Sequence, residues 1–240
     1  MPKMNSKVRI LSALLLAGTV TLTGCASTGS SSSNAAVNSR TARVETDGNR
    51  NVSSYVQRSR AFVTRTGEVY MMRGLANIFS RGIDRMAERL RARGVDAVDF
   101  NHADWRPIAE DVVRRSKSGQ VSYPIVIMGH SLGGNAAPEM ANYLAQNGVK
   151  VEYVVAFDPT LPRTVGPNIK RVVNFYLPHD EDNTIHAGAG FKGELKNINV
   201  SGVPGIKHTN VEKNPRFQAD VIERVMSITK EIKKPRKKRA

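Results

Sequence analysis

Short runs of apolar residues alternate along this chain with segments whose apolar residues recur every three or four positions. Six runs have the length and the β-branched or aromatic content of strands: 68–72, 95–100, 123–128, 151–157, 170–177 and, more weakly, 195–200. Strands that alternate with helices favour an α/β fold, in which a mostly parallel sheet carries helices on both faces.

Four segments between or after these runs have the spacing of amphipathic helices. Asp104 and Asn214 stand where a helix N-cap is expected, and Pro215 fits the first helical position. The apolar faces are Phe79, Ile83, Met86 and Leu90; Trp105, Ile108 and Val112; Ala136, Met140, Tyr143 and Leu144; and Phe217, Val221, Val225 and Ile228.

The beginning of the chain has the pattern of an export signal. Lys3, Lys7 and Arg9 precede an apolar run, 10–20, that is too short to span a bilayer comfortably. This pattern predicts a signal peptide over residues 1–24.

The signal ends at Leu22-Thr23-Gly24-Cys25, which resembles a bacterial lipobox: an apolar residue, two small residues and a cysteine. The resemblance implies cleavage before Cys25, the only cysteine of the chain, and a lipid anchor on it that holds the protein to the membrane. Ala26 at the next position implies the outer membrane of a Gram-negative cell, with the protein facing the periplasm. The alternative is an ordinary signal peptide followed by a chance cysteine.

Composition and charge divide the rest of the chain. Residues 25–57 are rich in small polar residues and predict a flexible tether, whereas 58–232 can form one domain and 233–240 is a basic, disordered tail. The formal net charge is +15, of which 1–24 contributes +3 and 230–239 contributes +6, leaving +6 for the remainder. Because the basic residues concentrate at the ends, a specific nucleic-acid partner is not expected.

The run 123–128 leads directly into Gly129-His130-Ser131-Leu132-Gly133, and a helical pattern follows. A G-x-S-x-G sequence between a strand and a helix is typical of a nucleophile elbow, a sharp turn that exposes the serine hydroxyl. The sequence therefore predicts Ser131 as a nucleophile.

The motif and the order of elements over residues 65–232 resemble the α/β-hydrolase superfamily. The chain is short for that family and leaves no room for a helical lid, so it resembles the small lidless esterases and thioesterases. The resemblance implies a serine hydrolase that needs no cofactor, with its triad in the order serine, acid, histidine.

The resemblance places the histidine between the last strand and the last helix. His208 fits that position, and His186 is the fallback. His102 precedes Ser131 and is out of order, while the side chain of His130 is expected to point away from the tip of the elbow.

Three carboxylates compete for the role of the acid. Asp158 ends the strand 151–157, and carboxyl ends of parallel strands are where sites form in such sheets. Asp180 and Asp182 follow the next strand, which is the commoner position of the acid in this fold. We expect Asp158, with Asp180 and Asp182 as alternatives.

The backbone N–H groups of Leu132 and Leu75 are the expected donors of the oxyanion hole, since they follow the nucleophile and the first strand. His179, Asp180, Asp182 and His186 carry metal-ligand chemistry, but their spacing matches no tight template, so no metal is expected.

These observations predict an exported, lipid-anchored serine hydrolase that acts on carboxylic esters or thioesters. Two alternatives stay open: a non-catalytic envelope protein that binds through the same scaffold, and an amidase or acyltransferase that uses the same triad. The oligomeric state is left open.

Overall fold

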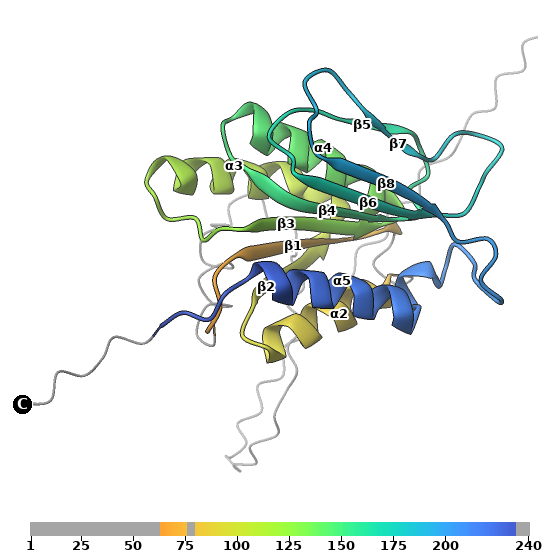
Figure 1. Cartoon of the computed structure of the whole chain (residues 1–240), viewed down its shortest axis with the longest axis horizontal. Coiled ribbons are helices and arrows are strands. Elements are labelled where there is room, and N and C mark those ends of the chain that lie inside the picture. Colours follow the sequence, from red (N-terminus) through yellow and green to blue (C-terminus); the bar gives the residue numbers. More distant parts are fainter. Residues whose placement is uncertain (1–62, 76–79, 234–240) are drawn as a thin grey trace, which may run out of the picture. The chain divides into compact units, whose positions relative to one another are not determined.

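The computed structural model describes residues 63–75 and 80–233, which form a parallel sheet with helices packed on it (Figure 1). The six strands of this sheet lie in the order β2-β1-β3-β4-β6-β8. Their bounds are β1 Glu68–Arg73, β2 Asp96–Asn101, β3 Ile125–His130, β4 Val151–Phe157, β6 Arg171–Tyr176 and β8 Glu194–Asn199. The predicted signal peptide, Cys25, the tether and residues 234–240 of the tail lie outside the described residues.

Helices cover both faces of the sheet (Figure 1). Helices α3 Trp105–Lys117 and α4 Leu132–Gln146 pack on one face, and α2 Arg81–Ala92 and α5 Pro215–Ile228 pack on the other. Short 3-10 turns, η3 His102–Asp104 and η4 Val211–Lys213, precede α3 and α5. None of the described helices combines the length and the apolar character needed to cross a bilayer.

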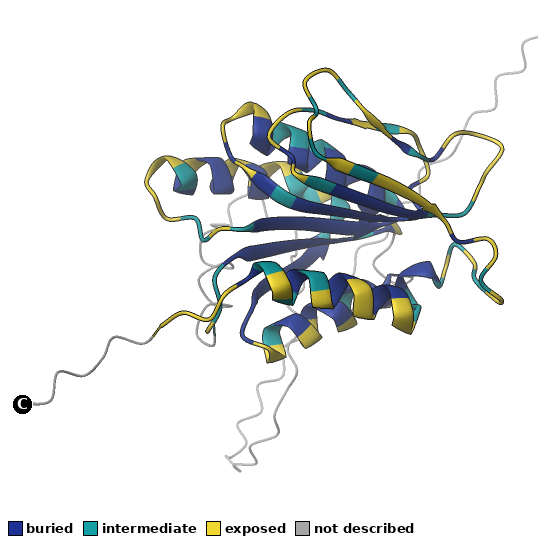
Figure 2. Ribbon diagram, viewed as in Figure 1, coloured by how far each residue is buried: buried dark blue, intermediate teal, exposed yellow. Residues whose placement is uncertain are grey.

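Each central strand contributes alternate side chains to two separate cores. Tyr70 and Met72 of β1 join the cluster under α3 and α4, whereas Val69 and Met71 join the cluster under α2 and α5. Figure 2 shows the result as central strands that are buried on both faces and helices that are exposed on their outer sides, whereas the edge strand β8 is mostly exposed. Such strands read as continuous apolar runs, which confirms the α/β fold class expected from the sequence.

Several details differ from the sequence-based expectation. Asp104 precedes α3 but its side chain caps nothing, because Asn101 accepts the Ala103 N–H and begins the extra turn η3. Asn214 does cap α5, accepting the N–H groups of Arg216 and Phe217. Phe79 lies outside the described residues.

A second, two-stranded parallel sheet was not anticipated. It pairs β5 Arg163–Val165 with β7 Ile185–Ala187, beside the main sheet. Strands of three residues are too short to produce a readable alternation, so the sequence carried no signal for them.

A buried ionic cluster stabilises the amino-terminal end of β1 in the main sheet. Arg115 donates to both oxygens of Glu68, each at 2.9 Å, to Asp111 at 2.7 Å and to the Tyr70 hydroxyl at 2.8 Å. Burial opposes ionisation of Glu68, but hydrogen bonds from Arg115, the Ser122 N–H and Tyr70 outweigh it and lower the pKa of that carboxyl. Glu68 is therefore a buried carboxylate that depends on its partners.

Replacing the guanidinium should destabilise the protein strongly, since it removes the cation that donates to both oxygens of buried Glu68 and one of the two arginines that pair with buried Asp111. We expect Arg115→Met to lower the free energy of unfolding by about 3–5 kcal/mol, measured by urea denaturation. Arg114→Met is the matched control: Arg114 also pairs with Asp111, but 67 % of its side chain is exposed. Arg114→Met should lower the free energy of unfolding by less than about 1 kcal/mol. Equal decreases in the two variants would contradict this account.

Candidate active site

Ser131 stands on a strained turn between β3 and α4. Its backbone lies at φ 57 and ψ −120, and its N–H donates to the Phe157 carbonyl at 3.0 Å. A Cβ on Gly129 would lie 2.2 Å from the Gly133 carbonyl oxygen, and a Cβ on Gly133 would lie 2.3 Å from the Met72 carbonyl oxygen. Both positions of the motif therefore require glycine, because backbone passes there at contact distance.

Three side chains that the sequence predicted as a triad meet at the carboxyl end of the sheet. His208, from the loop between β8 and η4, places Nε2 at 2.9 Å from Ser131 Oγ. Its Nδ1 lies 2.7 Å from Oδ2 of Asp158, which follows β4 directly. The three form one continuous hydrogen-bonded chain.

Asp158 is fully buried and is held from its other side as well. Its Oδ1 accepts the Leu177 N–H at 2.9 Å and the Asn183 amide at 3.1 Å. Asn183 is itself buried, and it also donates to the Leu177 carbonyl. No feature of the sequence distinguished Asn183 from its polar neighbours, so its support of Asp158 is apparent only from the structure.

The alternative residues lie elsewhere in the same loop region. Asp182 accepts the hydroxyl and the N–H of Thr184 and lies 2.6 Å from His186, and these hydrogen bonds lower its pKa to about 2. Asp180 is exposed. Within the part of the chain that the structure describes, neither carboxylate contacts His208, and the fallback His186 pairs with Asp182 and not with Ser131.

The structure also separates the group that offered metal-ligand chemistry. His179 turns toward the acid, with Nε2 at 3.5 Å from Asp158 Oδ1, so Asp158, His179 and His208 place ligand atoms within 4.8 Å of one another. These three could hold a cation, but Asp158 and His208 already share a short hydrogen bond.

The two expected oxyanion donors come from segments that border Ser131: Leu132 follows it in the chain, and Leu75 follows Gly74, which lies against it. Leu132 begins α4, and the first N–H groups of a helix have no intrahelical acceptor. Leu75 is exposed and follows Gly74, whose N–H is already used by the Ser80 hydroxyl at 2.8 Å. Leu75 is therefore the next candidate donor in that turn.

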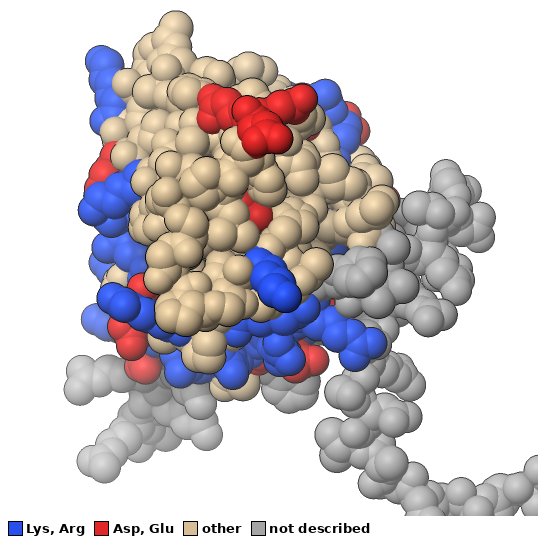
Figure 3. Space-filling model, turned by 90° about the vertical axis from the view of Figure 1, so that its right-hand side faces the viewer, with Lys and Arg blue, Asp and Glu red and all other residues tan. Residues whose placement is uncertain are grey.

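The surface at this end of the sheet is largely uncharged in its middle. Figure 3 views the end from which the strands exit, with acidic side chains gathered near the top and basic ones along the lower part. The loop after β6 carries exposed Asp180, Glu181 and Asp182.

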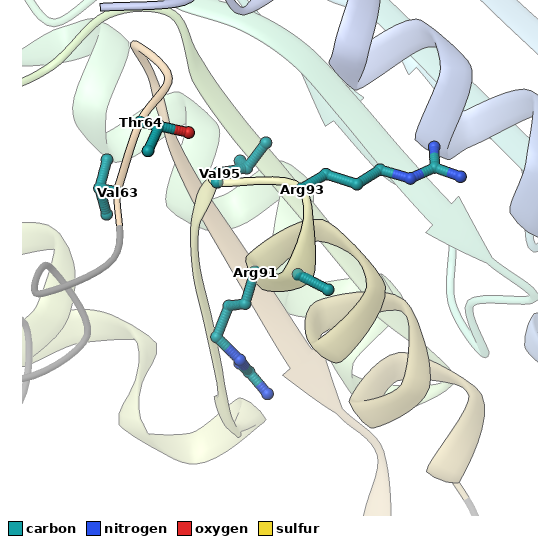
Figure 4. Close-up of a pocket in the computed structure, with 7 residues that line it drawn as sticks. Val63, Thr64, Arg91, Arg93 and Val95 are labelled. Atoms are coloured by element: carbon teal, nitrogen blue, oxygen red, sulfur yellow. The ribbon is translucent and has the colours of Figure 1, made fainter.

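A cavity of about 560 Å³ lies at the opposite edge of the sheet. It is bordered by Val63 and Thr64 and by residues 91–95, which run from the end of α2 to the residue before β2 (Figure 4). It is therefore separate from the hydrogen-bonded chain, which lies at the carboxyl ends of the strands, where sites form in such sheets.

A buried carboxyl lies behind the site. Glu212 of η4 is fully buried, and its Oε2 has no hydrogen-bond partner among the described residues and lies 3.8 Å from His130 Nε2. Burial raises the pKa of Glu212 to about 7, and burial lowers the pKa of His130 to about 4. At neutral pH His130 is uncharged, so the contact is not an ion pair.

Comparison with known proteins gives a family and several structural likenesses. Residues 36–175 match the family model described as Lipase (class 3), a span that includes Ser131 and Asp158. Similar solved structures include Est1E from Butyrivibrio proteoclasticus (13% identity, 68% of this chain and 88% of that one, TM-score 0.42). An acetylxylan esterase (15% identity, 69% and 99%, TM-score 0.40) and the NocB thioesterase domain (12% identity, 68% and 93%, TM-score 0.38) are also similar. No curated protein matches the sequence.

The raised pKa of Glu212 predicts a specific effect of pH on stability. The folded protein holds this proton more tightly than the unfolded chain, so stability is lost as pH rises from about 4.5 to about 7. Glu212→Gln should therefore match the wild type near pH 5 and exceed its free energy of unfolding at pH 8.5 by on the order of 3 kcal/mol. Urea denaturation at the two pH values measures this.

The exposed Glu223 of α5 provides the matched control. Glu223→Gln should keep the pH dependence of the wild type. The account of Glu212 is wrong if Glu212→Gln keeps it too.

Proposed function

This chain belongs to the class 3 lipase family and is a serine hydrolase of the α/β-hydrolase fold, and from that premise we propose an exported, lipid-anchored enzyme that cleaves carboxylic esters or thioesters. The observation that carries the proposal is the continuous chain from Ser131 Oγ through His208 to Asp158. An isolated serine hydroxyl is a weak nucleophile, so it needs a base within hydrogen-bond reach and an acid that orients the base.

In the proposed reaction, Ser131 Oγ attacks the carbonyl carbon while His208 Nε2 takes its proton. The Nδ1–H of His208 donates to Asp158, which fixes the tautomer that leaves Nε2 free to accept. Asp158 stabilises the imidazolium as it forms, and the Leu177 N–H and the Asn183 amide hold the carboxylate in place.

The negative charge on the carbonyl oxygen develops beside the amino terminus of α4. The N–H groups of Leu132 and Leu75 would donate to it, and the dipole of α4 favours the charge. His208 then passes its proton to the leaving alcohol or thiol, and an acyl group remains on Ser131. Water attacks this ester by the same steps in reverse and releases the carboxylic acid.

The surroundings of Ser131 favour an uncharged, modest acyl group or an exposed polymeric ester. Leu75 and Leu161 are exposed apolar side chains on the two loops that flank the turn. The backbone of Leu161 is held by Asn135 of α4 at 3.2 Å, and the position beside Leu75, Gly74, lies against Ser131. These side chains can cover an acyl chain without enclosing it.

We place the enzyme at the bacterial envelope, with lipidated Cys25 in the outer membrane and the domain in the periplasm. The support is the sequence Leu22-Thr23-Gly24-Cys25 after an apolar run, and Ala26 after it. The tether over 25–57 would then let the domain reach an insoluble or membrane-bound ester.

Substitutions in the chain of three residues should abolish hydrolysis of p-nitrophenyl esters. We expect Ser131→Ala and His208→Ala to lower kcat by at least about 10³-fold, and Asp158→Asn by about 10²–10⁴-fold, with the whole chain assayed from acetate to palmitate. The shorter acyl groups should give the higher kcat/KM.

Asp180→Asn, Asp182→Asn and His186→Ala are the matched controls, and each should keep kcat within about threefold. A loss in Asp182→Asn that Asp158→Asn does not share would move the role of the acid to Asp182. A folded wild type that hydrolyses no ester or thioester would favour a binding protein, and turnover of amides alone would favour an amidase.

Lipid attachment has a separate test. Cells that express the chain and take up an alkynyl palmitate should attach it to the wild type, and Cys25→Ser should abolish the label. Ser131→Ala is the control, because it should label like the wild type and so excludes an acyl-enzyme as the source. A label that persists in Cys25→Ser would contradict the anchor.

A further inference from the structure

The second residue of the motif, His130, makes contacts that the triad does not use. Its side chain is buried beneath the turn, with Nε2 at 2.7 Å from the His208 carbonyl oxygen. Its Nδ1 lies 2.9 Å from the Ser80 hydroxyl, which in turn accepts the Gly74 N–H at 2.8 Å. One imidazole therefore joins two segments that are far apart in the sequence.

The chemistry of these partners determines which atom donates in each of these hydrogen bonds. A carbonyl oxygen only accepts, so Nε2 of His130 carries the hydrogen and donates to His208. Burial keeps the pKa of His130 at about 4, so Nδ1 is an unprotonated acceptor at neutral pH. The Ser80 hydroxyl must then donate to Nδ1, which leaves its lone pairs for the Gly74 N–H.

Ser80 makes these contacts at the expense of a more usual one. It stands at the N-cap of α2, where a serine hydroxyl ordinarily accepts an N–H of the first helical turn. Here it makes no such bond, and its hydroxyl serves Gly74 and His130 instead. The site thus gains a link at the cost of a helix cap.

The two segments that His130 joins both border Ser131. The His208 carbonyl belongs to the residue whose ring lies between Ser131 and Asp158. At the other end, a Cβ on Gly74 would lie 3.0 Å from Ser131 Cβ, so the turn that carries Leu75 packs directly against the nucleophile. A shift of either segment by one ångström would spoil a geometry that catalysis needs.

We propose that His130 is a positioning residue. It fixes two segments relative to Ser131: the loop that carries His208, and the turn at Gly74 that carries Leu75. This inference rests on the proposed hydrolase function. His130 touches no reacting atom, and it acts through the His208 carbonyl on one side and through Ser80 on the other.

The two links can be separated by substitution. His130→Phe removes both, Ser80→Ala removes only the link to Gly74, and His130→Gln keeps an N–H near Nε2 for the His208 carbonyl but loses the acceptor at Nδ1. Tyr70→Phe is the control, since it loses buried hydrogen bonds to Glu68 and Arg115, which belong to the ionic cluster and not to the site. Active sites in each variant of the whole chain are counted by titration with a fluorophosphonate, so that rates refer to folded enzyme.

We expect His130→Phe to lower kcat for a p-nitrophenyl ester by about 10²-fold with KM changed less than about threefold. Ser80→Ala and His130→Gln should each lose about tenfold in kcat. The variant that carries both substitutions should have the same kcat as either single variant, because both substitutions break the same hydrogen bond between Ser80 and His130. Tyr70→Phe should keep kcat.

The outcomes separate the two proposals. A wild type without hydrolysis refutes the proposed function, and this inference falls with it. An active wild type whose His130→Phe variant keeps the kcat of the wild type overturns only the positioning role. If His130→Phe does not fold, unchanged kcat in both His130→Gln and Ser80→Ala overturns it equally.

Discussion

The position of Ser131 depends on close contact between backbone segments. A non-glycine residue at φ 57 and ψ −120 is strained, and it persists only where its surroundings leave no alternative. Gly129 packs against Gly133, and Gly133 packs against the end of β1, so the strand, the turn and α4 hold one another. The Ser131 N–H to Phe157 carbonyl bond ties the same turn to β4.

The partners of Ser131 come from loops, and the sheet decides where those loops begin. Asp158 follows β4, the neighbour of β3, and its backbone lies in the left-handed region at φ 46. His208 lies 77 positions from Ser131 in the chain and arrives through a loop that has no strand to guide it. Two hydrogen bonds hold this loop. Asp158 accepts one from the His208 ring, and the His130 ring donates the other to the His208 carbonyl oxygen.

The sequence was most informative where local chemistry and fold coincide. The elbow, the six long strands and the capped helix at Asn214 each have a readable pattern. The resemblance to the α/β-hydrolases then pointed to His208 as the histidine, and the end of a parallel strand pointed to Asp158 as the acid. The sequence was uninformative where a residue acts through a partner that is distant in the chain. Asn183 and Ser80 look like ordinary loop and cap residues, and the three-residue strands β5 and β7 have no period to detect. Asp104 failed as a cap for a related reason, since Asn101 had already begun a turn.

Mapping the site of covalent modification tests the central claim most directly. The whole chain would be treated with a fluorophosphonate ester, digested and analysed by mass spectrometry. A single phosphonyl group per molecule on Ser131, formed much more slowly in Asp158→Asn, is the result that an operating chain of Ser131, His208 and Asp158 predicts. A folded wild type that stays unmodified, or that is modified at another residue, would contradict it.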